Sequence, residues 1–175
     1  MMKKFLLSLS SFSPSLILYL ITVDFFPTII GIEFTLLKLI LIFIASSSFS
    51  KILLYFYKKS ENRDKIIIKS IEPIENQVIP TYIGLFVIML GLGGFPTLVQ
   101  LEIILLLFLV WSLFMERTFY FNLFWLVNYK LYKVTDEFGN SFSIYSKDQD
   151  IKISDKITKV GLLRINNFTF VDLGG

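Results

Sequence analysis

Four long apolar segments, separated by polar connections, constrain this chain more than any other feature. A helix needs about 20 mostly apolar residues to cross the hydrocarbon core of a bilayer. The third segment is the shortest, and Pro80 suits the first turn of its helix. The sequence therefore predicts an α-helical membrane protein, with four transmembrane helices in a domain of residues 1–128. The predicted helices cover residues 8–30, 34–57, 80–95 and 97–116.

The first segment has a rival interpretation as a signal peptide, because Lys3 and Lys4 precede it. A signal peptide would end at a cleavage site of small residues, and no such site follows this segment. The continuous apolar region begins only after Pro14 and extends past Phe26. We therefore expect a retained membrane helix.

The distribution of Lys and Arg predicts the orientation of these helices. Basic residues lie before the first segment, in the connection of residues 58–79 and after the fourth segment, whereas the connections at 24–33 and 91–97 contain none. Cytoplasmic connections of membrane proteins carry an excess of Lys and Arg. We therefore expect residues 58–79 and both termini on the cytoplasmic side. The abundance of Ile, Phe, Lys and Asn is typical of an AT-rich coding sequence, which is a weak hint of a bacterial source.

Period-two alternation begins at Tyr129 and predicts a small, cytoplasmic, β-rich tail of residues 129–175. YKLYKVTD and SFSIYS flank the turn EFGN, while TKVGLLRI and FTFVDL flank Asn166–Asn167, so each pair predicts a hairpin. A unit of this size rarely stabilises itself without disulfides or a metal. We expect the tail to pack on other copies, on the helices or on a soluble partner. The candidate docking residues are Phe142, Ile144, Phe168 and Phe170.

Two ionisable residues, Lys38 and Glu102, lie inside predicted helices. Each is about five residues from the outer end of its helix, which is ~7 Å at 1.5 Å per residue. An unpaired charge costs ~2.5 to 3.5 kcal/mol at mid-span and less near an end. A Lys38–Glu102 pair, within one chain or between subunits, is therefore one hypothesis. Separate contact of each side chain with the outer surface and an ion or proton path are the alternatives.

The second apolar segment carries several small residues, among them Ser46 and Ser50. These two are four residues apart and share one helix face, a spacing that lets helices approach closely. We interpret this face as a packing surface. The alternative is that it lines a pore in an oligomer.

The chain contains no Cys and no His. Thiol nucleophiles, disulfides, Ser-His-Asp catalysis and the usual zinc ligand sets are therefore excluded. The net charge of +3 is too small to argue for direct nucleic-acid binding. We expect no catalytic, cofactor-binding or metal-binding residue, and we expect membrane lipid and a protein partner as the ligands.

The four helices, the charged connection and the closing stretch LLRINNFTFVDL together resemble the KwaA family, the membrane component of the Kiwa anti-phage defence system. The resemblance covers the whole chain. It implies an inner-membrane homo-oligomer that senses phage infection at the envelope and works with a cytoplasmic DNA-binding partner, KwaB. The β-rich tail is then the natural docking surface for that partner. The resemblance carries no functional residues over to this chain.

The function that these observations favour is a non-enzymatic membrane sensor or scaffold whose cytoplasmic tail recruits a soluble effector. An oligomeric pore or small transporter is the alternative from a different class, motivated by Lys38, Glu102 and the serine face. A bacteriocin-immunity protein is a further alternative. A membrane enzyme is less favoured, because the acids do not cluster at a shared depth.

Overall fold

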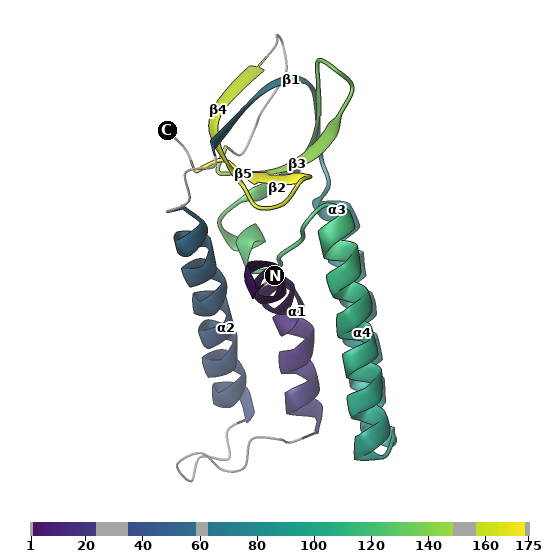
Figure 1. Cartoon of the computed structure of the whole chain (residues 1–175). Helices are drawn as coiled ribbons and strands as arrows, with labels where there is room; N and C mark the ends of the chain where they lie inside the picture. The colour runs from purple at the N-terminus through teal and green to yellow at the C-terminus, as the bar shows by residue number, and fades with distance from the viewer. Residues whose placement is uncertain (1, 24–34, 59–62, 149–156, 174–175) are drawn as a thin grey trace.

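The computed structural model describes residues 2–23, 35–58, 63–148 and 157–173. A group of four helices forms one half of the molecule and a closed β-barrel forms the other (Figure 1). The helices are α1 (Met2–Thr22), α2 (Thr35–Lys58), α3 (Glu75–Gly91) and α4 (Thr97–Arg117). Short 3₁₀ turns, η2 (Leu92–Gly94) and η3 (Trp125–Val127), follow α3 and precede the last four strands.

Helix α1 occupies the centre of the helical half and contacts each of the other three helices (Figure 1). Small side chains allow these close approaches, because Ser8, Ser10, Ser11 and Ser15 of α1 are all buried. Pro14 lies inside α1 and cannot donate a backbone hydrogen bond to the carbonyl of Ser10. The hydroxyl of Ser13 donates to that carbonyl instead, at 2.8 Å. The helix therefore continues through Pro14 rather than beginning there.

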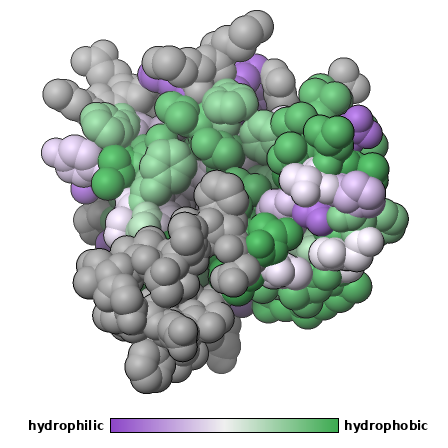
Figure 2. All heavy atoms as spheres, turned by 90° about the horizontal axis from the view of Figure 1, so that it is seen from below, coloured by the Kyte–Doolittle hydropathy of each residue, from purple (hydrophilic) through white to green (hydrophobic). Residues whose placement is uncertain are grey.

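The outward faces of α2, α3 and α4 are strongly apolar. Figure 2 views the molecule from the helix ends away from the barrel, and hydrophobic side chains cover much of this view. Within the described residues, four helices are long and apolar enough to cross a membrane, judged by length and composition. Six of the apolar side chains on these faces are each 55–66% exposed: Leu41, Ile44, Val87, Leu105, Leu106 and Leu109.

The five strands form a closed barrel in the order β1-β2-β3-β5-β4, with β4 pairing back to β1. Neighbouring strands are antiparallel except β3 and β5, which are parallel. The first strand comes from the connection between α2 and α3, and the other four follow α4 (Figure 1). The strands are β1 (Arg63–Pro73), β2 (Lys130–Asp136), β3 (Ser141–Ser146), β4 (Ile157–Arg164) and β5 (Thr169–Val171).

Two irregularities let β1 bend across the barrel and pair with a neighbour on each side. The pairing with β2 shifts between Ile68 and Ser70, which places one extra residue, Lys69, in β1. The pairing with β4 shifts between Asp64 and Ile66, and the extra residue there lies in β4 near Gly161. Gly161 has a φ of 74°, which a residue with a side chain rarely adopts. Bulges of this kind bend strands and increase their twist, as barrel closure requires.

The fold class predicted from the sequence is wrong in its β-rich part. The strands form a closed barrel rather than a small tail. β1 comes from the polar connection of residues 58–79, where Ile66, Ile67 and Ile68 indicate only a short strand or an interfacial patch from the sequence. The expectation that the tail is too small to be stable alone considered only residues 129–175. It therefore did not include β1. The helices meet the length and composition required for a membrane span, which by itself does not establish a membrane protein.

Helices α2 and α4 begin and end within one residue of the predicted ranges 34–57 and 97–116. Helix α1 begins at Met2, before the predicted start, and the prediction for residues 24–30 lies outside the described part of the chain. Helix α3 begins at Glu75, so Pro80 lies inside it rather than at its start.

Candidate functional site at the junction of helices and barrel

The segment between α4 and β2, residues 118–129, runs beneath the barrel where the helices meet it (Figure 1). Its side chains Tyr120, Asn122, Phe124 and Trp125 are at most 2% exposed. Buried polar groups need hydrogen-bond partners, and their partners here come from both halves of the molecule.

Asn122 is the centre of this junction. Its Nδ2 atom lies 3.0 Å from the Ser10 hydroxyl of α1, 2.9 Å from the Ser50 hydroxyl of α2 and 2.9 Å from the Tyr120 hydroxyl. A side-chain amide has two hydrogens to donate, so three acceptors compete for them. On the barrel side, the backbone N–H of Asn122 donates to the Tyr145 hydroxyl of β3 at 2.8 Å. One residue therefore joins α1, α2 and the barrel.

A second set of bonds, centred on Ser11, joins the remaining helices to the same segment. The Trp111 indole of α4 donates to the Ser11 hydroxyl at 3.1 Å, and the Tyr82 hydroxyl of α3 donates to the Ser11 carbonyl at 2.8 Å. The Ser11 hydroxyl donates to the carbonyl of Phe121. The junction therefore contacts all four helices by hydrogen bonds.

On the barrel side, Thr169 of β5 completes the junction. The backbone N–H of Tyr120 donates to the Thr169 hydroxyl at 2.7 Å, and this hydroxyl lies 2.8 Å from that of Ser143 in β3. The Trp125 ring packs against the rings of Tyr120 and Tyr145, with centroids 5.2 Å apart in each case. Burial raises the pKa of Tyr120 and of Tyr145 far above the ordinary value. Both phenols therefore stay neutral and act as hydrogen-bonding groups.

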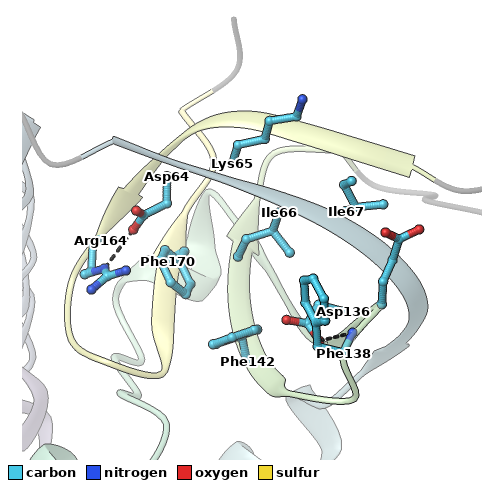
Figure 3. Close-up of a pocket in the computed structure, with 10 residues that line it drawn as sticks. Asp64, Lys65, Ile66, Ile67, Asp136, Phe138, Phe142, Arg164 and Phe170 are labelled. Atoms are coloured by element: carbon cyan, nitrogen blue, oxygen red, sulfur yellow. Dashed lines mark hydrogen bonds and ion pairs between the residues drawn. The ribbon is translucent and has the colours of Figure 1, made fainter.

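A pocket of about 400 Å³ opens in the barrel wall (Figure 3). Ile66, Phe142 and Phe170 supply its apolar part, and two of these, Ile66 and Phe170, belong to the barrel core. The Arg164–Asp64 ion pair, with 2.7 Å between Nε and Oδ2, lies at one side in Figure 3. Asp136 and Phe138 lie at the other side, in the turn between β2 and β3.

The β2–β3 turn holds Phe138 out from the barrel, where it is 88% exposed. Gly139 allows the turn by adopting a φ of 85°. The Asp136 carboxylate accepts hydrogen bonds from the Asn140 side chain and from backbone N–H groups of the turn, which lowers the pKa of Asp136. The turn is therefore stabilised internally while Phe138 faces outward.

A family model described as "Anti-phage protein KwaA" matches residues 3–171. The chain belongs to the KwaA family. Neither the curated proteins nor the solved structures contained a match.

The family match confirms the resemblance inferred from the sequence, and it spans both the helices and the barrel. Membership of the KwaA family gives this chain a role in anti-phage defence. The barrel and the helical half therefore belong to one family architecture rather than to a helical protein with an appended tail.

The structure of this KwaA family member places Ser50, one of the two predicted packing residues, at the junction. Ser50 is fully buried and bonded to Asn122, and Ser46 is half-buried one turn earlier on α2. The Ser50 hydroxyl therefore faces the junction rather than a pore. The packing role of Ser46 stays a prediction.

The predicted charge pair stays a prediction as well. Glu102 is exposed on α4, and the side chain of Lys38 on α2 lies outside the described part of the chain. In Figure 1, α2 and α4 lie on different sides of α1. The version within one chain and the version between subunits both stay predictions.

The four candidate docking residues divide into two groups. Ile144 and Phe170 are each 2% exposed and belong to the barrel core, and Phe170 also lines the pocket in the barrel wall. The period-two alternation of the sequence placed all four on predicted strands. It did not indicate which face of the strands points into the barrel. Phe142 is half-buried in the pocket wall, and Phe168 is 37% exposed in the turn before β5.

Asn122, Tyr120, Tyr145 and Phe138 are not among the residues predicted from the sequence. Asn122 is a polar residue inside the aromatic stretch TFYFNLFWLVNY, which directly follows the fourth predicted helix. A lone amide among aromatic residues is a pattern that could have drawn attention to it, because a buried amide requires partners.

Proposed function

We propose that this chain is a non-enzymatic sensor and scaffold of anti-phage defence, with its helices in the bacterial inner membrane and its barrel in the cytoplasm. In this role, a disturbance of the envelope changes how the helices pack, and the barrel passes the change to a soluble effector. The observation that carries the proposal is the position of Asn122. Its side chain contacts α1 and α2, while its backbone is bound to β3.

Two features support the membrane location. The helices expose large apolar side chains over their outward faces, as lipid contact requires. The basic residues that flank the helices on one side, Lys3, Lys4, Lys58 and Arg63, all lie at the barrel end. An excess of Lys and Arg marks the cytoplasmic side, so the barrel is assigned to the cytoplasm.

The competition at Asn122 supports the sensing step. Three acceptors share two amide hydrogens, so a small shift of α1 or α2 changes which acceptors are bonded. The alternative bonding patterns differ in the positions of the helices but use the same groups. A stimulus that favours one helix arrangement shifts the populations of these patterns.

The pocket in the barrel wall, with Phe138 beside it, is the surface we assign to the effector. Exposed aromatic side chains beside an apolar pocket are typical anchors of protein interfaces. The family resemblance implies that the effector is the DNA-binding protein KwaB, which leaves nucleic-acid binding to the partner. The exposed apolar face of α2 supports assembly into a homo-oligomer, because a second copy would cover it.

The test uses the full chain expressed with its soluble partner in cells challenged by phage. Asn122→Ala is expected to leave the chain in the membrane fraction with the partner bound, and to lose protection against phage. Asn128→Ala, which changes an exposed asparagine of the same segment, is the matched control and should protect like the wild type. Full protection by Asn122→Ala would overturn the coupling role.

The docking assignment has its own test. Phe138→Ser is expected to reduce co-purification of the partner, because it removes the exposed anchor of the pocket. Val160→Ser changes a side chain that is 68% exposed elsewhere on the barrel and serves as the control. Equal partner recovery from both variants would move the docking surface away from the pocket.

A further inference from the structure

A second pocket, of about 640 Å³, lies where the start of α1, the last turns of α4 and the β4–β5 turn come together. It shares Arg164 with the pocket in the barrel wall and Tyr120 with the Asn122 junction, and its other lining residues belong to neither. Its size is in the range of small-molecule sites in proteins. Its lining divides into a basic part and an apolar part, and that division indicates what it binds.

The basic part consists of Lys3, Lys4 and Arg164. The Nε atom of Arg164 is bonded to Asp64, while its two terminal nitrogens make no hydrogen bond to the described residues. Lys3 lies with its ammonium 6.0 Å from the centre of the Tyr57 ring. None of the described residues that line the pocket is acidic. This part of the pocket therefore complements an anion.

The apolar part consists of Phe5, Leu109 and Leu113, which are 48–56% exposed. These side chains are continuous with the apolar outer faces of the helices. A free inorganic anion would leave them in contact with water. An acyl chain attached to the anion would cover them.

A buried hydroxyl provides independent evidence for a ligand. Ser112 lines the pocket, and its hydroxyl is buried with no hydrogen-bond partner in the described part of the chain. Buried polar groups without a partner are rare in folded proteins. An ester or headgroup oxygen in the pocket would supply the missing acceptor.

We propose that this pocket binds one anionic phospholipid, with its phosphate at Lys3, Lys4 and Arg164 and its acyl chain along Phe5, Leu109 and Leu113. The inference rests on the proposed membrane location, because the pocket then lies at the cytoplasmic headgroup level. Arg164 lines both pockets, so the bound phosphate and Asp64 contact the same guanidinium. Through Arg164, binding of the lipid affects the pocket that we assign to the effector.

The experiment titrates the detergent-solubilised full chain with phosphatidylglycerol and counts bound lipid by native mass spectrometry. Phosphatidylcholine tests the need for net negative charge, and soluble glycerophosphoglycerol tests the need for acyl chains. We expect saturable binding of one phosphatidylglycerol per chain, with much weaker binding of the other two. Equal binding of the soluble headgroup would assign the site to a free phosphate compound and overturn the proposal.

The variant Lys3→Gln/Lys4→Gln removes two exposed charges without disturbing the core. Each basic residue near an anionic lipid contributes about five-fold in affinity, so the pair should weaken binding roughly 25-fold. Lys65→Gln/Lys69→Gln removes the same charge from β1 and should bind like the wild type. Equal weakening in both variants would mean a general charge effect and would overturn the site.

Ser112→Ala distinguishes binding in the pocket from attraction by surface charge, because it removes a hydroxyl of the pocket without changing the charge of the chain. We expect it to weaken phosphatidylglycerol binding, and unchanged binding would remove the hydroxyl from the site. Membrane fractionation and partner recovery are measured on the same samples. A wild-type chain that is in the membrane and holds its partner but shows no lipid preference refutes the lipid site alone. A wild-type chain that fails either of those two measurements refutes the proposed function.

Discussion

The side-chain amide of Asn122 lies 2.9 Å from the hydroxyl of Ser50, and this contact joins the segment after α4 to α2. The two residues are far apart in the sequence, and both are fully buried. Because Ser10 and Tyr120 also accept from the same amide, the loss of Ser50 alone leaves an acceptor for each amide hydrogen.

Ser50→Ala should therefore destabilise the chain only mildly, by about 0.5–1 kcal/mol, as the loss of one hydrogen bond with the remaining partners intact. Asn122→Ala should cost more, about 2–3 kcal/mol, because it leaves several buried hydroxyls without a donor. Thermal unfolding in detergent measures both. If Ser50→Ala were the more damaging change, Asn122 would not be the centre of the junction.

Tyr145→Phe tests the bond between the junction and the barrel. The phenol accepts the backbone N–H of Asn122, so its removal leaves a buried N–H without a partner and should cost about 1–3 kcal/mol. Tyr55→Phe, at a site that is 69% exposed, is the control and should have almost no effect. A comparable loss in both variants would argue that the hydroxyl of Tyr145 contributes little.

Gly161→Ala tests the bulge that lets β4 pair with β1. The φ of 74° disfavours any residue with a side chain, and we expect a loss of about 1–2 kcal/mol. Gly84→Ala is the control, because Gly84 lies in α3 with open space around its Cα. Alanine favours helix by up to about 1 kcal/mol over glycine, so this control should be neutral or stabilising. Unfolding of the two variants is compared under identical conditions.

The ion pairs of Lys159 make the stability of the barrel depend on pH in the alkaline range. Burial alone would lower the pKa of Lys159, but the hydrogen bonds to Asp148 and Asp172 outweigh it, and the pKa is raised above 10.5. A raised pKa gives a contribution to stability that is complete below pH 10.5 and is lost as the pH rises through the folded value. Lys159→Gln should remove this dependence. Identical unfolding curves of wild type and variant across that range would contradict the prediction.

Glu102→Gln tests the charge pair between subunits. If Glu102 pairs with Lys38 of a second copy, the change leaves a cation without its partner and should weaken the oligomer. Lys38→Met in the same chain should restore part of the stability, because both charges are then gone. The mass distribution of the solubilised oligomer measures each step. Single variants that assemble like the wild type would leave Glu102 as an exposed residue without this role.

The sequence predicts the helices and the two C-terminal hairpins well, because apolar length and period-two alternation are local properties. It does not predict the closure of the barrel. The alternation of Ile66 and Ile68 is short and lies in a charged connection, and its partner strands follow two helices later. The Asn122 junction is equally non-local, since its partners come from α1, α2 and β3. Only the serines on one face of α2 indicated close packing there.

The place of β1 in the chain has a consequence for biosynthesis. β1 ends at Pro73 and its neighbour β2 begins at Lys130, with α3 and α4 made in between. At 5–20 residues per second, the ribosome needs ~3–11 s to deliver that neighbour. During this interval both edges of β1 are unpaired, and such edges are the usual starting points of aggregation. The charged residues Arg63, Asp64, Lys65 and Lys69 along β1 are well placed to keep the unpaired strand soluble while α3 and α4 are synthesised.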